Sequence, residues 1–219
     1  MIQKKQNQKI YKTVEWWIFC FGVSMVVLLA GVGWYFYESK TELVQVLSLV
    51  FAAHTFGGRA AGIGLCIMNG LNNFWTISYN FYLEVLIVCI AYSVSTLSIN
   101  NYIKFRVVRY YAIQLERKAK RHKEKIAKYG WLGLFLFVMT PLPVTGPVMG
   151  SIIGFLLKFR ISKNFSATFL GTLVAILIWT FFFDYLEENL QVIRYILITI
   201  IFVVLISYAR DIRNLFKKN

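Results

Sequence analysis

The chain has 219 residues, of which 58% are hydrophobic and 16% are charged, whereas about a quarter of the residues in a soluble domain are charged. Together with a mean hydropathy of +0.59, this composition excludes a soluble globular enzyme, a disordered tail and a nucleic-acid-binding domain, despite the formal net charge of +14. Two uncharged runs, Trp16–Tyr37 and Phe165–Phe183, are each long enough to cross a bilayer core of about 30 Å. The sequence therefore predicts an integral membrane protein with several spans.

Lysine and arginine are concentrated in four blocks. These blocks hold 21 of the 24 basic residues and comprise residues 4–12, 104–128, 158–163 and 210–218. The connections around Lys40 and before Arg194 are instead net acidic. Because loops rich in Lys and Arg stay in the cytoplasm, we expect all four blocks and both termini of the chain on the cytoplasmic side.

Two further apolar segments are interrupted near their middle. Leu43–Met68 is broken at His54–Arg59, and Trp131–Leu157 is broken at Pro141–Pro147, which leaves pieces of 9 to 11 residues. Such pieces are too short to cross the core. If both segments crossed fully, 11 of the 21 block residues would be cytoplasmic, whereas two re-entrant hairpins place all 21 there. The charges thus favour re-entrant hairpins over ordinary spans kinked by Gly and Pro.

The predicted fold is an all-α integral membrane domain of residues 1–219, with four transmembrane helices and two re-entrant helical hairpins in an inverted repeat. Its parts are a first span at Trp16–Tyr37, a first repeat at about residues 43–99, a cytoplasmic basic amphipathic helix at about 100–128, a second repeat at about 129–183 and a C-terminal span at about 192–209. The second span lies within Phe74–Ile99 and the third is Phe165–Phe183. In inverted repeats, the broken helices of the two halves meet near the midplane and form a substrate site.

Glycine and proline at the two interruptions suit broken helices. Gly57 and Gly58 permit close backbone approach at the first tip. Pro141, Pro143 and Pro147, the three prolines of the chain, remove backbone donors at the second tip and prevent a continuous helix. Because unpaired backbone groups are costly in lipid, both tips are expected to lie inside protein or to line water.

Arg59, directly after the first tip, is the main candidate for substrate binding. An arginine within the membrane tends to face a cavity or a partner, and its guanidinium can hold an anionic head group through two hydrogen bonds. The other expected substrate-binding residues are Gly57, Gly58, Thr145, Gly146 and Ser151. The alternatives are that Arg59 reaches the outer surface, and that Thr145 and Ser151 only satisfy backbone groups.

Glu84 and His54 are the candidates for proton coupling. If the second span begins near Phe74, Glu84 lies about 15 Å into the membrane, where burial and a nearby Arg59 would act on its charge in opposite directions. If the span begins nearer Phe81, Glu84 is an interfacial acid. His54 precedes the Gly-Gly-Arg tip and is suited to relay protons because imidazole titrates near neutral pH; the alternative is a histidine that is simply hydrogen-bonded within the fold.

The second interruption also carries a family resemblance. Residues 141–151 read Pro-Leu-Pro-Val-Thr-Gly-Pro-Val-Met-Gly-Ser and are followed by an apolar half-helix, Lys158-Phe159-Arg160 and Phe169-Leu170-Gly171. This pattern resembles the second signature of the small multidrug export proteins, Pro-Leu-Pro-Gly-Thr-Gly, with Val144 in place of the first glycine and Pro147 where a small residue is usual. The family's first signature, Glu-Leu-Arg-Gly-Ala-Ile-Pro, falls on residues 57–63, where the arginine and the small residues are kept and the acidic residue is missing.

More distantly, the plan is similar to that of DedA-type (VTT domain) proteins, which have two re-entrant hairpins in inverted repeats and include lipid flippases and scramblases. Together these features predict an inner-membrane transporter or lipid flippase that moves an amphiphilic, anionic, lipid-like solute between the hairpins, with proton coupling. The alternatives are a small multidrug exporter of cationic amphiphilic drugs, in which Glu84 binds the cation and Arg59 is a gate, and a non-transporting membrane assembly factor. No enzymatic activity, metal or cofactor is expected, because no nucleophile with a base and no ligand cluster is present.

The segment Lys104–Lys128 is expected to bind anionic lipid head groups. It is a basic helix with a thin apolar stripe at Ala112, Leu115, Ala119 and Ile126, and each basic residue near an anionic leaflet contributes about 1 kcal/mol. No base-reading motif points to nucleic acid. The expected partners are therefore membrane lipid or an amphiphilic small molecule, and the sequence is compatible with a homodimer.

Overall fold

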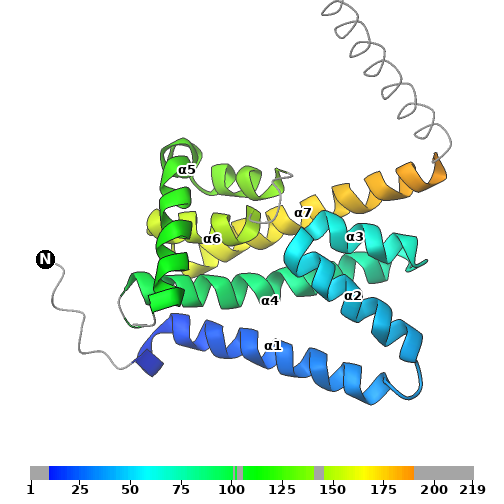
Figure 1. Ribbon diagram of the computed structural model, residues 1–219. Coiled ribbons are helices and arrows are strands. Elements are labelled where there is room, and N and C mark those ends of the chain that lie inside the picture. The colour runs from blue at the N-terminus through cyan, green and yellow to red at the C-terminus, as the bar shows by residue number, and fades with distance from the viewer. Residues whose placement is uncertain (1–9, 101, 103–105, 141–145, 190–219) are drawn as a thin grey trace, which may run out of the picture. The chain divides into compact units, whose positions relative to one another are not determined.

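A computed structural model describes residues 10–100, 102, 106–140 and 146–189 (Figure 1). This part of the chain contains eight helices and no strand. The helices are η2 (Ile10–Lys12), α1 (Val14–Phe36), α2 (Thr41–Gly57), α3 (Arg59–Met68), α4 (Asn73–Ile99), α5 (Arg106–Met139), α6 (Gly146–Leu156) and α7 (Ile161–Glu188). The predicted C-terminal span at 192–209 lies outside the described residues, as do Pro141, Pro143 and Thr145.

Three of these helices are long and apolar enough to cross a membrane. They are α1, α4 and residues Ile161–Leu186 of α7, with lengths of 23, 27 and 26 residues. At about 1.5 Å per residue, each exceeds the roughly 30 Å of the hydrocarbon core. The first three predicted spans are thus confirmed as helices, and the chain is a multi-pass membrane protein.

Capping residues set the start of the first two long helices. The Thr13 hydroxyl accepts a hydrogen bond from the Trp16 N–H at 3.3 Å, and the Asn72 side chain accepts one from the Trp75 N–H at 3.0 Å. Both side chains satisfy backbone donors that the first helical turn leaves unpaired. Because Asn72 starts α4 before Phe74, Glu84 lies well inside this helix.

The chain is divided into two compact units, Met1–Thr180 (unit 1) and Phe181–Asn219. Unit 1 contains α1 to α6 and the first twenty residues of α7. Within it α4 is the most deeply buried long helix, whereas most of α1 is exposed. The described part of the second unit consists of residues 181–189, which form the end of α7 and the turn after it.

Close packing within unit 1 depends on small residues and on a few tyrosines. A Cβ on Gly22 of α1 would lie 2.8 Å from the Ile90 side chain of α4, so glycine permits the close approach of the two helices. Tyr82 of α4 donates a hydrogen bond to the Met25 carbonyl of α1 at 2.7 Å, and Tyr79 donates one to the Leu47 carbonyl of α2 at 2.9 Å. These contacts hold α4 between α1 and α2.

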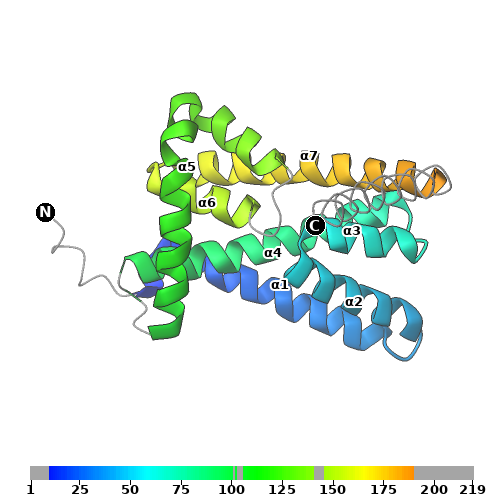
Figure 2. The ribbon, with the colours of Figure 1, turned by 45° about the horizontal axis from the view of Figure 1, so that its top comes forward.

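The short helices α2 and α3 pack against each other and against α4 (Figures 1 and 2). The break between them is Gly58, with φ 79° and ψ −176°. This φ lies in the region that favours glycine, and the Gly58 N–H donates to the His54 carbonyl at 2.9 Å to close the last turn of α2. The predicted interruption at His54–Arg59 is therefore a real break in the helix.

Helix α5 contains a second break, at Gly130, where φ is 58° and ψ is −124°. Before it, the first part of α5 corresponds to the predicted basic helix and runs across the direction of α4 in both views (Figures 1 and 2). After it, residues 131–139 pack with α6. The apolar cluster under α5 joins Ala119 and Ile126 to Leu134, Met149, Ile152, Ile153 and Ala167. This cluster fixes α5 on α6 and the start of α7.

Candidate functional site

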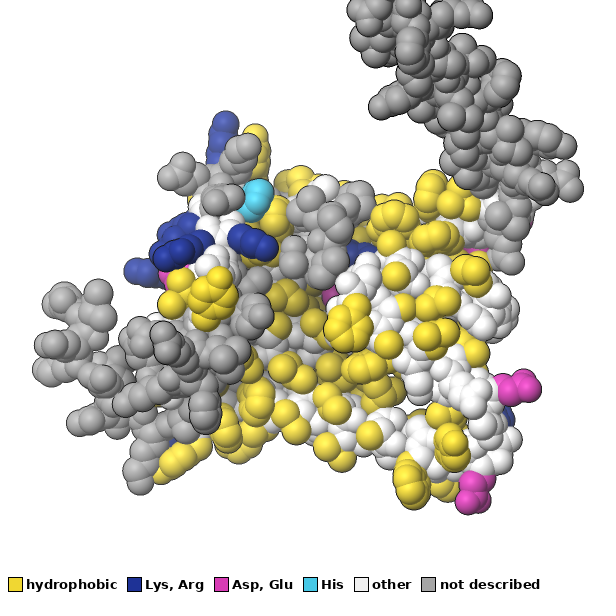
Figure 3. Space-filling model, in the orientation of Figure 1, with side chains coloured by type: hydrophobic (Ala, Val, Ile, Leu, Met, Phe, Trp, Pro, Cys, Tyr) yellow, Lys and Arg dark blue, Asp and Glu magenta, His cyan; other side chains and the backbone are white. Residues whose placement is uncertain are grey.

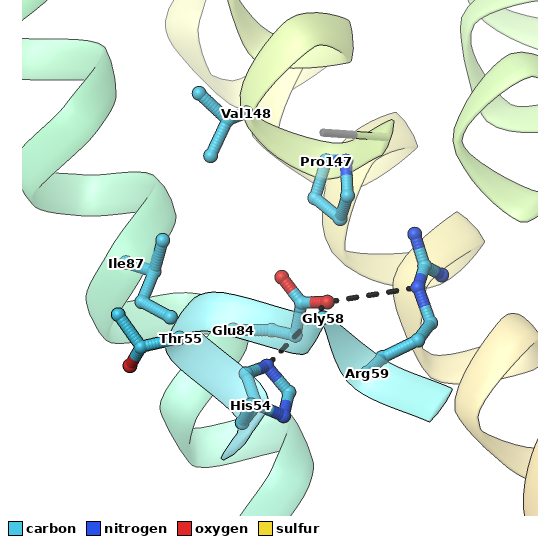
Figure 4. A pocket seen from close by; sticks show the side chains of 8 residues that line it. All are labelled: His54, Thr55, Gly58, Arg59, Glu84, Ile87, Pro147 and Val148. Atoms are coloured by element: carbon cyan, nitrogen blue, oxygen red, sulfur yellow. Dashed lines mark ion pairs between the residues drawn. The ribbon is translucent and has the colours of Figure 1, made fainter. Parts of the chain in front are cut away.

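Three ionisable side chains from three helices meet in the interior of unit 1. They are His54 near the end of α2, Arg59 at the start of α3 and Glu84 in α4, with relative exposures of 3%, 6% and 6%. Glu84 Oε1 lies 3.6 Å from Arg59 Nε and 3.7 Å from His54 Nε2 (Figure 4). The predicted proximity of Arg59 and Glu84 is therefore confirmed, and Arg59 does not reach the surface. The cluster of these three residues is called the charge cluster below.

The local sequence explains why these groups converge. Because α2 ends at Gly57 and α3 begins at Arg59, the single residue Gly58 separates His54 and Arg59 onto two helices that share one tip. Glu84 is eleven residues into α4, about 16 Å from its start at 1.5 Å per residue. Glu84 therefore lies at the depth of the tip at which α2 ends and α3 begins.

Asn80, one turn before Glu84, fixes the orientation of the histidine. Its Oδ1 accepts a hydrogen bond from His54 Nδ1 at 2.9 Å, and its amide donates to the Thr76 carbonyl at 2.9 Å. With the proton on Nδ1, a neutral His54 presents a lone pair on Nε2 toward the Glu84 carboxylate. Two hydrogen-bond acceptors, His54 Nε2 and Glu84 Oε1, thus lie 3.7 Å apart. A proton bound to either atom would allow a hydrogen bond between them.

The remaining nitrogens of Arg59 are only weakly bonded within the described part of the chain. Nη2 donates to the Val138 carbonyl of α5 at 3.4 Å, and Nη1 has no hydrogen-bond partner there. A Cβ on Gly146 would lie 2.7 Å from Arg59 Nη2, so this glycine leaves room for the guanidinium beside the start of α6. Arg59 therefore links the α2–α3 hairpin to the α5–α6 region.

The charge cluster borders a small pocket. Its lining residues are His54, Thr55, Gly58, Arg59, Glu84, Ile87, Pro147 and Val148 (Figure 4). The first turns of α3 and α6 both contribute to this lining, so the positive ends of two helix dipoles border the same space as the Glu84 carboxylate. The free volume of about 30 Å³ admits water but is far below the roughly 300–1,000 Å³ of a pocket for a drug-sized molecule.

The other predicted site residues have different positions. Gly58 and Pro147 line the pocket, and Gly146 lies against Arg59, whereas Gly57 is the exposed last residue of α2. Ser151 is buried, but its hydroxyl donates to the Val148 carbonyl at 2.8 Å and its own carbonyl accepts from Asn164 at 2.8 Å. Its contacts thus join α6 to α7, and it does not line the pocket. Thr145, Pro141 and Pro143 lie outside the described residues.

Sequence reasoning missed Asn80 and the Val138 carbonyl. Asn80 had a visible signal, because Thr76, Asn80 and Glu84 recur every four residues and so form one polar stripe along the first half of α4. All three side chains are buried. The role of Val138 had no signal, because any residue supplies a backbone carbonyl.

Comparison with known protein families identifies the chain. Residues 59–178 match the model of the family described as "Putative small multi-drug export protein", so the match covers 120 of the 219 residues. The chain belongs to the small multi-drug export family. The matched region begins at Arg59 and contains Glu84, Gly146 and Pro147. No curated protein and no solved structure matches the chain.

Membership in the small multi-drug export family confirms the resemblance predicted from residues 141–151. It supports the alternative of drug export better than the first expectation of an anionic, lipid-like solute. The substrate of this small multi-drug export protein is not given by the match.

Proposed function

We propose that this membrane protein exports small amphiphilic cations in exchange for protons, with Glu84 as the carboxylate that both compete for. The observation that carries the proposal is the burial of Glu84 in α4 with Arg59 and His54 at 3.6 and 3.7 Å. Acidic groups within transmembrane helices are expensive and commonly mark ion pathways. Membership in the small multi-drug export family supports drugs as the exported solute.

In this proposal Arg59 is a gate. Arg59 pairs with the Glu84 carboxylate when no substrate is present, and a cationic substrate must displace the guanidinium from it. The Arg59–Glu84 distance of 3.6 Å and the 3.4 Å contact to Val138 are longer than well-formed charged hydrogen bonds of roughly 2.7–2.9 Å. A guanidinium held this loosely is easier to displace than one held by two short bonds.

His54 completes the exchange. With Asn80 holding the proton on Nδ1, Nε2 can accept a proton and pass it to Glu84. Protonation of Glu84 removes the charge that binds the substrate cation, so substrate and proton exclude each other. Because the present pocket holds about 30 Å³, a drug-sized cation can enter only when the first turns of α3 and α6 separate.

The proposed topology has four spans and two re-entrant hairpins, in an inverted repeat, in the inner membrane. It is supported by the short α2 and α3, which pack against each other and meet at a single glycine, and by the distribution of charge. Basic side chains gather at the α5 side of unit 1, whereas acidic side chains lie where α1 connects to α2 (Figure 3). This separation follows the positive-inside rule.

Cysteine labelling from the two sides of the membrane tests the topology. A single cysteine at Lys40 should react with an impermeant reagent added outside, and one at Lys120 or Lys163 should react only after permeabilisation. External labelling at Lys120 would contradict the four-span arrangement.

A second candidate function is movement of an anionic, lipid-like solute. It is favoured by Arg59 Nη1, which has no hydrogen-bond partner among the described residues, and by the positive ends of α3 and α6 beside it. Once Glu84 is protonated, these groups leave a net positive site that attracts an anion. Both candidates use the charge cluster for transport rather than for bond-breaking chemistry, and we propose no enzymatic activity.

Transport by reconstituted vesicles separates the two candidates. With a pH gradient, we expect uptake of a fluorescent lipophilic cation by the wild type, loss of this uptake in Glu84→Gln, and normal uptake in Glu42→Gln, whose acid is exposed at the start of α2. Uptake of a fluorescent anionic lipid in place of the cation would support the second candidate. Gradient-driven cation uptake by Glu84→Gln at the wild-type rate would contradict the proposed exchange.

A further inference from the structure

The α5 side of unit 1 is strongly basic and largely uncompensated. Its exposed cationic side chains are Arg117, Lys118, Lys120, Lys128, Lys158, Arg160 and Lys163. One ion pair is formed on α5 among the described side chains, between Lys120 and Glu116 at 2.7 Å. Over the whole stretch 104–128 the sequence has ten basic residues and two acidic ones. This surface therefore attracts anionic groups from outside the chain.

The orientation of α5 suits the plane of a membrane surface. Before Gly130 it runs across the direction of α4 in both views (Figures 1 and 2), so it lies along the membrane plane when α4 crosses the bilayer. Ala119 and Ile126 face the apolar cluster of α6. At 100° per residue, Arg117 and Lys128 lie on the opposite side of α5 from these two residues, and Lys118 and Lys120 lie on its flanks. The helix is thus packed by its apolar stripe and presents its cations outward.

Aromatic residues place this surface at the level of lipid head groups. Trp131, just after Gly130, stacks on Phe135 with ring centroids 5.5 Å apart and donates from its indole N–H to the Ser166 hydroxyl at 2.9 Å. Lys163 lies 4.6 Å from the centroid of the Phe159 ring. Tryptophan and lysine at the end of a span are typical of the boundary between hydrocarbon and head groups.

We propose that the basic face of α5, together with Lys158, Arg160 and Lys163, is a binding surface for anionic phospholipid head groups, and that bound lipid steadies the half-helix after Gly130. Charge complementarity points to anionic phospholipid as the occupant, because its head groups are the anions present at this depth along the membrane surface. The half-helix, residues 131–139, carries the Val138 carbonyl that binds Arg59. Lipid bound to α5 therefore restrains the half-helix that follows Gly130 and, through the Val138 carbonyl, the position of Arg59 in the charge cluster. The binding surface does not depend on the proposed export function.

Lipid binding to the full-length purified protein tests the surface directly. Fluorescent phosphatidylglycerol should bind in preference to fluorescent phosphatidylcholine, and the preference should fall as salt is raised because exposed charges are screened. The triple variant R117Q/K118Q/K120Q should bind phosphatidylglycerol on the order of 100-fold more weakly. Two controls should bind as the wild type does: R117K/K118R/K120R, which keeps the charge, and Lys40→Gln, at the other end of unit 1.

Equal binding of the two lipids by the wild type would overturn the proposal, as would unchanged phosphatidylglycerol binding by the triple glutamine variant. If that variant does not fold, the lipid preference and salt dependence of the wild type still decide. The effect on the half-helix is read by hydrogen–deuterium exchange at residues 131–139 in nanodiscs. Exchange there should slow when phosphatidylglycerol replaces phosphatidylcholine, and equal exchange in both lipids would refute that part of the proposal. Neither measurement requires transport, so failure here and failure of the export function are distinguishable.

Discussion

The α2–α3 hairpin and the α5–α6 region make different contributions to the pocket and to the surroundings of Arg59. The first supplies titratable side chains, His54 and Arg59, on either side of one glycine with a left-handed φ. The second supplies a backbone carbonyl from Val138, the apolar side chains of Pro147 and Val148, and space at Gly146. The first region, together with Glu84 of α4, therefore supplies the charged groups, and the second supplies the backbone and apolar surroundings that hold Arg59 in place.

This difference predicts that charge substitutions on the first side will have the largest effects. Arg59→Gln leaves the Glu84 carboxylate buried without its cation, and breaking a buried pair in this way costs about 3–5 kcal/mol of the free energy of unfolding. The double variant Arg59→Gln/Glu84→Gln should recover much of that loss, because two neutral amides replace the pair. Thermal unfolding in mild detergent measures both. A double variant less stable than Arg59→Gln would show that the two groups do not act as a pair.

Matched glycine substitutions on the two sides sharpen the comparison. A Cβ on Gly62 of α3 would lie 2.5 Å from Asn80 Oδ1 and 2.8 Å from His54 Nδ1, and such overpacking of held side chains typically costs about 1–3 kcal/mol. A Cβ on Gly146 would press on the flexible end of Arg59, at 2.7 Å, and would lie at an ordinary contact distance of 3.6 Å from the Val138 carbonyl. We therefore expect Gly62→Ala to lower the free energy of unfolding more than Gly146→Ala.

The control for these glycines is Gly31→Ala, because no atom lies within 4 Å of a Cβ at that position. Denaturant titration of the three variants should rank them Gly62, Gly146 and Gly31, from the largest loss to the smallest. An equal loss for Gly146→Ala and Gly62→Ala would mean that the guanidinium is held as rigidly as His54 and Asn80.

Substitution of Asn80 is expected to change the pH dependence of transport rather than its maximal rate. Asn80→Ala removes the acceptor for His54 Nδ1, so the ring is free to place its proton on Nε2 and to donate to Glu84 without taking up a proton from solution. We expect the maximal rate of gradient-driven transport to stay within a few-fold of the wild type and its pH midpoint to shift. Transport rates across a pH series in vesicles measure this. A pH profile identical to that of the wild type would show that the tautomer of His54 is irrelevant to coupling.

Ser151 should give the smallest effect. Its hydroxyl bonds to the Val148 carbonyl of its own helix at 2.8 Å, and such a local bond contributes at most about 1 kcal/mol. Ser151→Ala is expected to transport like the wild type. A strong loss of transport without loss of folded protein would restore the sequence-based assignment of Ser151 to the substrate site.

The sequence alone was enough to predict three long helices, the break in the first interrupted segment and the family resemblance. Apolar stretches of 18 residues or more predict helices that cross the membrane, so length and hydropathy were enough to find α1, α4 and α7. The break at residues 54–59 was also predictable, because Gly57 and Gly58 stand between two short apolar pieces. Arg59 and Glu84 were linked in advance because charges are rare in such segments and each is costly alone.

Only the tertiary structure decided which side chains meet. The polar stripe places Asn80 on the same face of α4 as Glu84, but it does not show that Asn80 binds His54. Helix α6 is mostly apolar and so has little periodicity to indicate which face turns toward its neighbours, and the sequence did not show that Ser151 bonds within its own helix and to α7. The rotation of α4 and α6 about their axes is set by close contacts at Gly62, Gly146 and Gly154 with residues of other helices. The contact between the Val138 carbonyl and Arg59 was not predictable for the same reason. It depends on how the helices pack, and the identity of a side chain does not indicate which backbone carbonyls accept hydrogen bonds.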